Sequence, residues 1–150
     1  MEMVDMNDLK NQYFININDF DQEGLSIILS LHNRFGRRAY NVFGGRNRNT
    51  FDMGRYVVKV PKCLDGFADN DWEGSVSNAN DDRAVVRYAR TRLAYLEEVP
   101  IVFMERVNPA TGAEIISKLG YEPDWTMCVD CGQVGFARDG RLVAYDYGCR

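Results

Sequence analysis

The stretch from Val42 to Lys62, "VFGGRNRNTFDMGRYVVKVPK", decides the fold that we predict for this chain of 150 residues. Two glycine-marked turns, one at Gly44-Gly45 and one at Gly54, divide it into runs rich in β-branched and aromatic residues. Short runs of this kind, separated by glycine turns, are typical of antiparallel strands. We therefore expect successive antiparallel strands within residues 39–61.

A helix is expected before these strands. Apolar residues recur at three- and four-residue steps after a candidate cap at Asp19 or Asp21 and before a stop at Gly36: Leu25, Ile28, Leu31 and Phe35. This spacing places one apolar stripe on a helix. Residues 1–18 are expected to be a loosely structured lead-in with one short apolar run at residues 13–17.

The rest of the chain predicts a mixture of helices and strands. We expect a short helix in "NDWEGSVSNAN" capped by Asn70 or Asp71, strands in "AVVRYARTRLAYL" and "VPIVFME", a helix in "PATGAEIISKLG" ending at Gly120, and a last hairpin turning at Asp139-Gly140. An Asp-Gly pair between apolar runs is a strong hairpin signal. The order predicts an α+β domain. We divide it into a helical lead-in (1–36), a sheet (37–107) and a smaller closing segment (108–150).

Composition places the chain among ordinary folded domains. It is 45% hydrophobic and 27% charged, which suits a single domain of this length. The sequence has no run of 18 apolar residues, and "MEMVDMNDLK" lacks the basic and apolar regions of a signal peptide. We therefore expect a cytoplasmic protein with no membrane segment.

Positive charge is concentrated between residues 37 and 62. Seven cations face one carboxylate there, a net of +6, so the remainder of this −4 chain carries −10; the cations are Arg37, Arg38, Arg46, Arg48, Arg55, Lys59 and Lys62. Such a stretch can receive phosphates, a nucleotide or an acidic protein partner, or can form a solvated face of the sheet. Nucleic acid is not the expected ligand, because the acidic remainder would repel it.

The four cysteines are expected to be reduced in a cytoplasmic protein. Cys128 and Cys131 form a C-x-x-C pair, which raises zinc binding or redox chemistry. A zinc site would need two further ligands, and Cys63, Cys149 and the single histidine, His32, are the candidates. The alternative is that these thiols are partly buried and only pack.

The strand run "VVKV" and its surroundings resemble the amino-terminal lobe of protein kinases. Kinases place a glycine-rich turn between two strands and a phosphate-binding lysine on the third strand, which corresponds here to Gly44-Gly45 and Lys59. In that family a glutamate on the next helix pairs with the lysine, and Glu73 takes this position. The sequence pattern "D-aliphatic-G" followed by "V-K-V-P" also resembles the sequences of small kinase-like proteins of bacteriophages.

The resemblance extends to the end of the chain. "VPIVFMERV" looks like the strand that leads into the kinase hinge, which implies that the backbone near Met104 and Glu105 would bind adenine. Asp146-Tyr147-Gly148 is similar to the metal-binding D-F-G triplet, and the residue thirteen before it, Gln133, stands where kinases carry a metal-binding asparagine.

Other residues depart from the kinase pattern. Cys128 stands five residues before Gln133, where the catalytic base belongs, and a thiol cannot replace that carboxylate. Asp130 lies nearby and is the remaining candidate for a catalytic carboxylate. Only 22 residues separate Glu105 from Cys128, and two follow Gly148, so we expect the substrate-binding parts of a kinase to be absent.

Three functions follow from these features. The first is a catalytically impaired kinase-like protein that acts as a protein-interaction module, such as a phage accessory protein that inhibits a host enzyme or defence factor. The second is a phosphotransferase that binds ATP and Mg²⁺ through Lys59, Glu73, Gln133 and Asp146. The third is a small domain, unrelated to kinases, that binds zinc or an acidic partner.

The predicted sheet also raises the question of what covers it. Four apolar residues would be left exposed unless the helix at residues 113–119 or a second subunit covers them: Leu93, Tyr95, Ile101 and Phe103. Large uncovered apolar patches are rare on monomers. A homodimer is therefore among the expected states of the protein.

Overall fold

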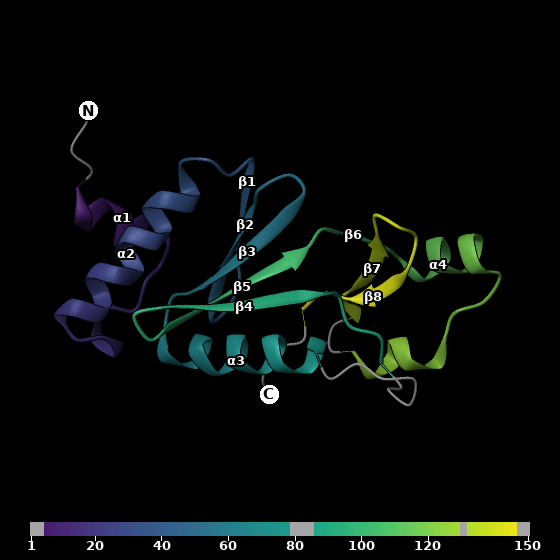
Figure 1. Cartoon of the computed structure of the whole chain (residues 1–150). Coiled ribbons are helices and arrows are strands. Elements are labelled where there is room, and N and C mark those ends of the chain that lie inside the picture. Colours follow the sequence, from purple (N-terminus) through teal and green to yellow (C-terminus); the bar gives the residue numbers. More distant parts are fainter. Residues whose placement is uncertain (1–4, 79–85, 130–131, 147–150) are drawn as a thin grey trace.

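The structure, a computed structural model, describes residues 5–78, 86–129 and 132–146 of the chain. A five-stranded antiparallel sheet and a smaller three-stranded sheet form its framework, with helices packed against them (Figure 1). The predicted α+β class is therefore confirmed. Within the described ranges, none of the helices is long and apolar enough to cross a membrane.

The larger sheet contains the strands predicted from the glycine turns. Its order is β1-β2-β3-β5-β4, and the strands are β1 Asn41–Gly44, β2 Arg48–Asp52, β3 Tyr56–Pro61, β4 Thr91–Leu96 and β5 Val99–Glu105. Gly54, between β2 and β3, has a φ of +95°, which glycine adopts without steric cost. β3 and β5 lie in the middle of the sheet, whereas β1 and β4 form its edges.

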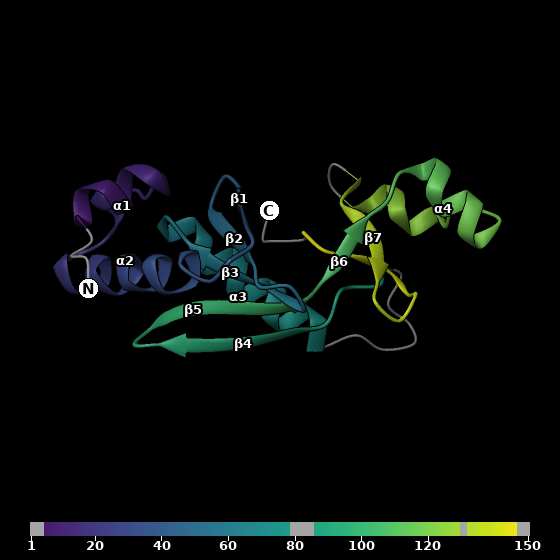
Figure 2. The same ribbon diagram turned by 90° about the horizontal axis from the view of Figure 1, so that it is seen from above.

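The two faces of this sheet are covered by different helices. Side chains alternate along the strands, so Val58, Val60 and Ile101 face helix α2 (Gln22–Gly36), whereas Lys59 and Val102 face the other side. Helix α3 (Leu64–Asn78) covers that other face (Figures 1 and 2). The sheet therefore has an apolar face under α2 and a face under α3 that carries a charged residue on a central strand.

Helix α2 is the helix predicted from apolar spacing. The Asp21 carboxylate caps it by accepting a hydrogen bond of 2.7 Å from the Gly24 N–H. Gly36 is its last residue, so the predicted stop is confirmed. A Cβ at Gly36 would lie 2.1 Å from the Tyr13 Oη. Glycine is present because Tyr13 packs directly on the backbone.

The prediction of a loose lead-in before α2 is also wrong. Residues Met6–Gln12 form helix α1 and Ile17–Asp19 form a 3₁₀ turn, η1. Leu9, Tyr13 and Ile15 are buried in the core beneath α2. The segment therefore contributes to the core on that face of the sheet.

Two predicted elements have different bounds in the structure. The helix expected at residues 70–80 begins at Leu64, so Asn70 is a buried residue inside α3 and not its cap. The strand expected over residues 84–96 is confirmed only as β4; before it, Tyr88 makes a single parallel bridge to Ala144 of the smaller sheet.

The turn between β4 and β5 has an unusual backbone. Glu97 and Glu98 have φ angles of 46° and 77°, both in the left-handed region. Two-residue hairpin turns with positive φ at both positions favour Asn-Gly or Gly-Gly. Two glutamates at such positions carry a conformational cost.

The smaller sheet has the order β6-β7-β8 and comprises β6 Val107–Pro109, β7 Val134–Ala137 and β8 Leu142–Ala144. The predicted β7–β8 hairpin is confirmed, with Gly140 at a φ of +93°. β6 was not predicted. Between β6 and β7 lie helix α4 (Gly112–Leu119) and a 3₁₀ turn, η2 (Asp124–Cys128).

Helix α4 matches its prediction closely. Thr111 and Glu114 form a capping box at its start, and Gly120 ends it with a φ of 84°. α4 does not cover the larger sheet in the way that was expected, because Ile101 lies under α2 and Leu93 packs on Gly74 of α3. Tyr95 stays exposed, at 59%.

Candidate functional site

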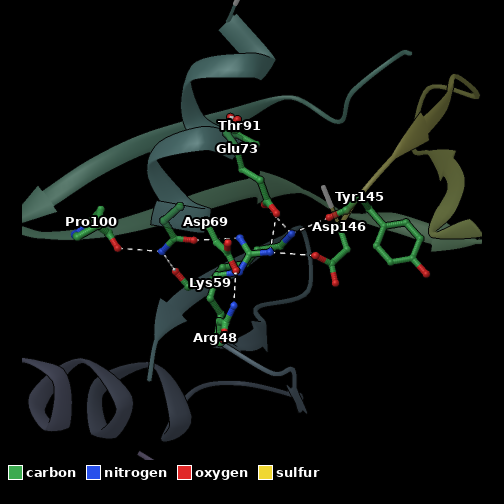
Figure 3. Close-up of polar contacts among 10 residues, drawn as sticks. Arg48, Lys59, Asp69, Glu73, Thr91, Pro100, Tyr145 and Asp146 are labelled. Atoms are coloured by element: carbon green, nitrogen blue, oxygen red, sulfur yellow. Dashed lines mark hydrogen bonds and ion pairs between the residues drawn. The ribbon is translucent and has the colours of Figure 1, made fainter. Parts of the chain in front are cut away.

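Four charged side chains from four separate segments meet on the face of the sheet that α3 covers. Arg48 comes from β2, Lys59 from β3, Glu73 from α3, and Asp146 follows β8 (Figure 3). We call these four residues the ion-pair network. Strand alternation directs Arg48 and Lys59 to this face, and the third turn of α3 places Glu73 above them.

The contacts within the ion-pair network are short and direct. Lys59 Nζ lies 2.7 Å from Glu73 Oε1, and Arg48 Nη2 lies 2.5 Å from Glu73 Oε2 and 2.9 Å from Asp146 Oδ1. Lys59 Nζ also donates to the Tyr145 carbonyl at 2.6 Å. Arg48 is thus the bridge between the α3 carboxylate and the segment after β8.

Asn70 supports this arrangement from one turn earlier in α3. Its amide nitrogen donates to the Lys59 carbonyl at 3.1 Å and to the Pro100 carbonyl at 2.8 Å, while its oxygen accepts from Arg48 Nη1 at 3.0 Å. One buried side chain therefore ties α3 to β3, to β5 and to the guanidinium. Burial without such partners would cost several kcal/mol (about 1–3 per group).

The electrostatics of the site follow from burial and pairing. Glu73 is fully buried, which by itself would raise the pKa of its carboxyl, but the charges of Lys59 and Arg48 outweigh burial and lower that pKa. Burial lowers the pKa of Lys59, and Glu73 opposes the shift. Two cations and two carboxylates balance one another within the network, so its structural role needs no external ion.

Gln133 and Asp146, the predicted metal ligands, do lie together. With its amide nitrogen assigned to the side that faces acceptors, Gln133 lies 3.1 Å from Asp146 Oδ2 and 3.2 Å from the Asp146 carbonyl. Asp146 is therefore held by an amide on one side and by the Arg48 guanidinium on the other. Asp130, the candidate catalytic carboxylate, lies outside the described residues, as do Tyr147 and Gly148.

The predicted nucleotide-binding backbone is engaged elsewhere. Gly44 ends β1, and the Gly45 N–H donates to the Arg48 carbonyl at 2.9 Å. The Glu105 N–H donates to the Arg90 carbonyl at 3.0 Å, and its carboxylate pairs with Arg141. Adenine binding by the backbone near Met104 and Glu105 stays a prediction.

The basic stretch predicted from sequence does not form one surface. Arg37, Arg38, Arg46 and Arg55 are exposed, but Arg48 is only 7% exposed. The prediction that Arg48 is part of a partner-binding surface is wrong. Its buried guanidinium donates hydrogen bonds to Glu73, Asp146 and Asn70.

The predicted zinc ligands are not gathered in the described part of the chain. No group of three or more His, Cys, Asp or Glu side chains in residues 5–78, 86–129 and 132–146 could hold a metal ion. His32 is buried between α2 and β2, where its Nδ1 lies 2.8 Å from the Ile28 carbonyl and its Nε2 lies 3.0 Å from the Asn49 amide. Both ring nitrogens are therefore engaged in the core. Cys131 and Cys149 lie outside the described residues.

Sequence reasoning brought together Lys59, Glu73 and Asp146 but missed Arg48 and Asn70 as members of the same site. Asn70 stands three residues before Glu73, which places both on one face of a helix, so a longer predicted helix would have paired them. Arg48 gave a weaker signal. It stands at an odd separation from the apolar Phe51, which indicates the opposite face of the same strand.

Comparison with known proteins identifies no relative. No protein-family model, curated protein or solved structure has a significant match to this chain. The kinase-like relationship, predicted from Lys59, Glu73 and Asp146, therefore stays a prediction.

Proposed function

We propose that this chain is a kinase-like protein that does not transfer phosphate and acts as a protein-interaction module. The observation that carries the proposal is the Arg48 guanidinium, which bridges Glu73 and Asp146 between the strand lysine and the predicted metal-binding carboxylate. Phosphates and Mg²⁺ would have to occupy this position in an active kinase. In this protein an internal cation supplies the positive charge there.

Nucleotide binding would require the network to be rebuilt. A metal ion on Asp146 would compete with the Arg48 contact, and a phosphate on Lys59 would compete with the Tyr145 carbonyl. Mg²⁺ prefers one or two carboxylates together with substrate phosphates, and the carboxylate available here is already neutralised. These competing contacts support a structural role for the network.

The surface that supports an interaction role is the edge strand β1. All four of its residues are exposed, and Tyr40 and Phe43 beside and within it are 77% and 57% exposed. Arg37, four residues before β1, and Arg55, in the β2–β3 turn, are exposed near the same end of β1, where Asn41 pairs with Asp52. Aromatic side chains and arginine are enriched at the centres of protein interfaces, and an edge strand offers unpaired backbone groups to an extended segment. A partner with an acidic surface fits these residues.

The identity of the partner is proposed from the resemblance to phage-encoded kinase-like proteins. On that basis we expect a host enzyme or defence factor in an infected bacterium, bound in its cytoplasm and inhibited by this chain. Zinc, ATP and Mg²⁺ have no part in this function. ATP–Mg²⁺ binding is the outcome that would favour the phosphotransferase alternative.

The first experiment measures nucleotide binding. Any ligand that binds the native state raises the melting temperature by mass action. Because we expect no nucleotide to bind, a thermal-shift titration with ATP and Mg²⁺ to several millimolar should leave the melting temperature unchanged. A rise that disappears in Asp146→Ala would overturn the proposal and support a nucleotide site at the network.

The second experiment separates the network from the surface. Lys59→Met with Asp146→Asn removes one cation and one anion and leaves the Arg48–Glu73 pair intact, so this variant is expected to fold and to retain the partner captured by affinity purification. Arg37→Glu with Arg55→Glu is expected to lose that partner. Loss of the partner in the folded network variant, with retention in the surface variant, would contradict the proposal.

A further inference from the structure

The seam between helix α2 and the β4–β5 hairpin has opposite charges at its two ends. At one end, a hollow of ≈ 340 Å³ is lined by four carboxylate residues and no cation: Asp21, Glu23, Glu97 and Glu98. We call this the acidic end of the seam. It lies where α2 begins and where the β4–β5 hairpin turns (Figure 2).

The other end of the seam is a groove of ≈ 390 Å³ with the opposite character. Three arginines line it, Arg34 and Arg38 from the end of α2 and Arg92 from β4, and no carboxylate residue lines it. Its walls are apolar or aromatic: Leu31, Phe35, Met53, Tyr56, Ala94, Tyr95, Leu96, Ile101 and Phe103. The Arg92 guanidinium stacks over Phe103 at 5.2 Å from the ring centroid. We call this the basic end.

Within the described residues, neither end of the seam is neutralised by ion pairs. In the described ranges, Arg34, Arg38 and Arg92 make no ion pair with a carboxylate, and Glu23, Glu97 and Glu98 make none with a cation. The acidic and basic groups lie too far apart along the seam to pair with one another: eleven residues of helix separate Glu23 from Arg34, about 16 Å at 1.5 Å per residue.

From the acidic end of the seam to the basic end, both walls carry acidic, then apolar, then basic side chains, although the two chains run in opposite directions. Along α2 the order is acidic, apolar and then basic, and along β4 toward its turn it is basic, apolar and then acidic. Because α2 begins near the hairpin turn, these orders coincide in space. Leu96, 40% exposed, lies between the two ends on β4, and Ile27, partly buried, lies between them on α2.

We propose that this seam is the interface of a homodimer in which two copies pack with their α2 helices antiparallel. A two-fold axis through the middle of the seam sets the acidic end of each copy against the basic end of the other. The same acidic-to-basic contact therefore forms twice in the dimer. The apolar residues between the ends pack across the axis. An acidic partner of another kind would explain the basic end but would leave Glu23, Glu97 and Glu98 at the other end unexplained.

The test is a charge-swap experiment on the purified full chain. Arg34→Glu with Arg38→Glu reverses two charges at the basic end, and Glu97→Lys with Glu98→Lys reverses two at the acidic end. Analytical ultracentrifugation over a concentration series is expected to show a wild-type dimer and a dimer dissociation constant at least 100-fold weaker for each variant. Each variant sets like charges against each other at both contacts of its own dimer.

Mixing the two variants is the decisive arm. An equimolar mixture carries one contact with both charge signs exchanged and one with the native signs, so it is expected to regain a species of twice the monomer mass. The matched control is Arg37→Glu with Arg55→Glu, which changes the net charge by the same amount outside the seam and is expected to keep the wild-type dissociation constant. Far-ultraviolet circular dichroism confirms folding, and Arg34→Gln with Arg38→Gln serves if the reversed variant does not fold.

Several results would overturn the proposal. The first is a wild-type chain that stays monomeric at about 0.2 mM in the ultracentrifuge. The second is a dimer that neither charge reversal weakens. The third is a pair of weakened variants that do not associate when mixed. A monomeric chain that binds an acidic protein through Arg34 and Arg38 would instead assign the groove to that partner. These results are independent of the proposed function, because Arg37→Glu with Arg55→Glu loses the host partner and keeps the dimer.

Discussion

Replacing Glu73 with glutamine is the perturbation that tests the ion-pair network most directly. The substitution keeps the shape of a fully buried side chain and removes the charge that Arg48 and Lys59 both contact. Arg48 can still pair with Asp146, but Lys59 loses the carboxylate that lies 2.7 Å from its buried ammonium group. The variant therefore has to bury an under-compensated cation or release its proton.

The expected loss of stability is large. Removing one partner of a buried ion pair costs about 3–5 kcal/mol. With a urea dependence of about 2 kcal/mol per molar for a domain of this size, the unfolding midpoint should fall by about 1.5–2.5 M. Glu73 is 0% exposed and its partners are 7% and 4% exposed, so solvent screening reduces this figure little.

The assay is urea unfolding followed by tryptophan fluorescence and circular dichroism. Glu122→Gln, at an exposed position, is the matched control. We expect it to change the free energy of unfolding by less than about 0.5 kcal/mol. Lys59→Met with Glu73→Met removes one charge of each sign and leaves the 2.9 Å Arg48–Asp146 pair, so we expect this double variant to be more stable than Glu73→Gln alone.

The pH dependence gives a second readout of the same variant. The folded-state pKa of Glu73 is lowered, so its contribution is fully present above its unfolded value of about 4.3 and is lost as the pH falls through the folded value. The gap between wild type and Glu73→Gln should therefore narrow well below pH 4. A loss under about 1 kcal/mol at pH 7, or a double variant less stable than the single one, would refute the reasoning.

Three further predictions concern the core. Burial lowers the pKa of His32 to about 4, against the opposing hydrogen bond to a carbonyl. About 3 kcal/mol of stability should therefore be lost as the pH falls from about 6.5 to about 4. A His32→Gln variant should lack this pH dependence in urea titrations at several pH values. Gly36→Ala should cost about 1–3 kcal/mol, because the new methyl would lie 2.1 Å from the Tyr13 Oη; a thermal melt that is unchanged would contradict this close contact. Gly74→Ala should cost a similar amount (about 1–3 kcal/mol), because its methyl would lie 2.6 Å from the Leu93 Cβ, and Leu93→Ala should remove most of that penalty in a double-mutant cycle.

Local signals predicted much of the fold. The glycine turns marked β1, β2 and β3, and helix α4 carried its own cap and stop at Thr111 and Gly120. Helix α1 was missed although Leu9 and Tyr13 stand four residues apart, because its polar remainder has the composition of a loop. The start of α3 was missed because residues 64–69 contain a glycine and two aspartates and form no continuous apolar stripe.

The candidate site was predictable only in part. The Lys59–Glu73 contact was expected from a resemblance, since fourteen residues of sequence carry no distance information by themselves. The inward position of Arg48 depends on its pairing opposite Pro61, and such a register is set by the assembled sheet. Arg46, two residues earlier, has the same composition signal and is exposed. Burial of a charge is decided by tertiary contacts, so a basic stretch in the sequence cannot separate these two arginines.

The glutamate pair in the β4–β5 turn sets a conflict between folding and the proposed dimerisation. Glu97 and Glu98 both adopt left-handed backbone angles that an Asn-Gly pair would accept at lower cost. Glu97→Asn with Glu98→Gly should therefore raise the stability of the folded monomer by about 1–2 kcal/mol. The same change removes two of the four carboxylates that line the acidic end of the seam. A directed-evolution screen for thermostability would enrich the Asn-Gly pair and, in doing so, would select against the proposed dimer.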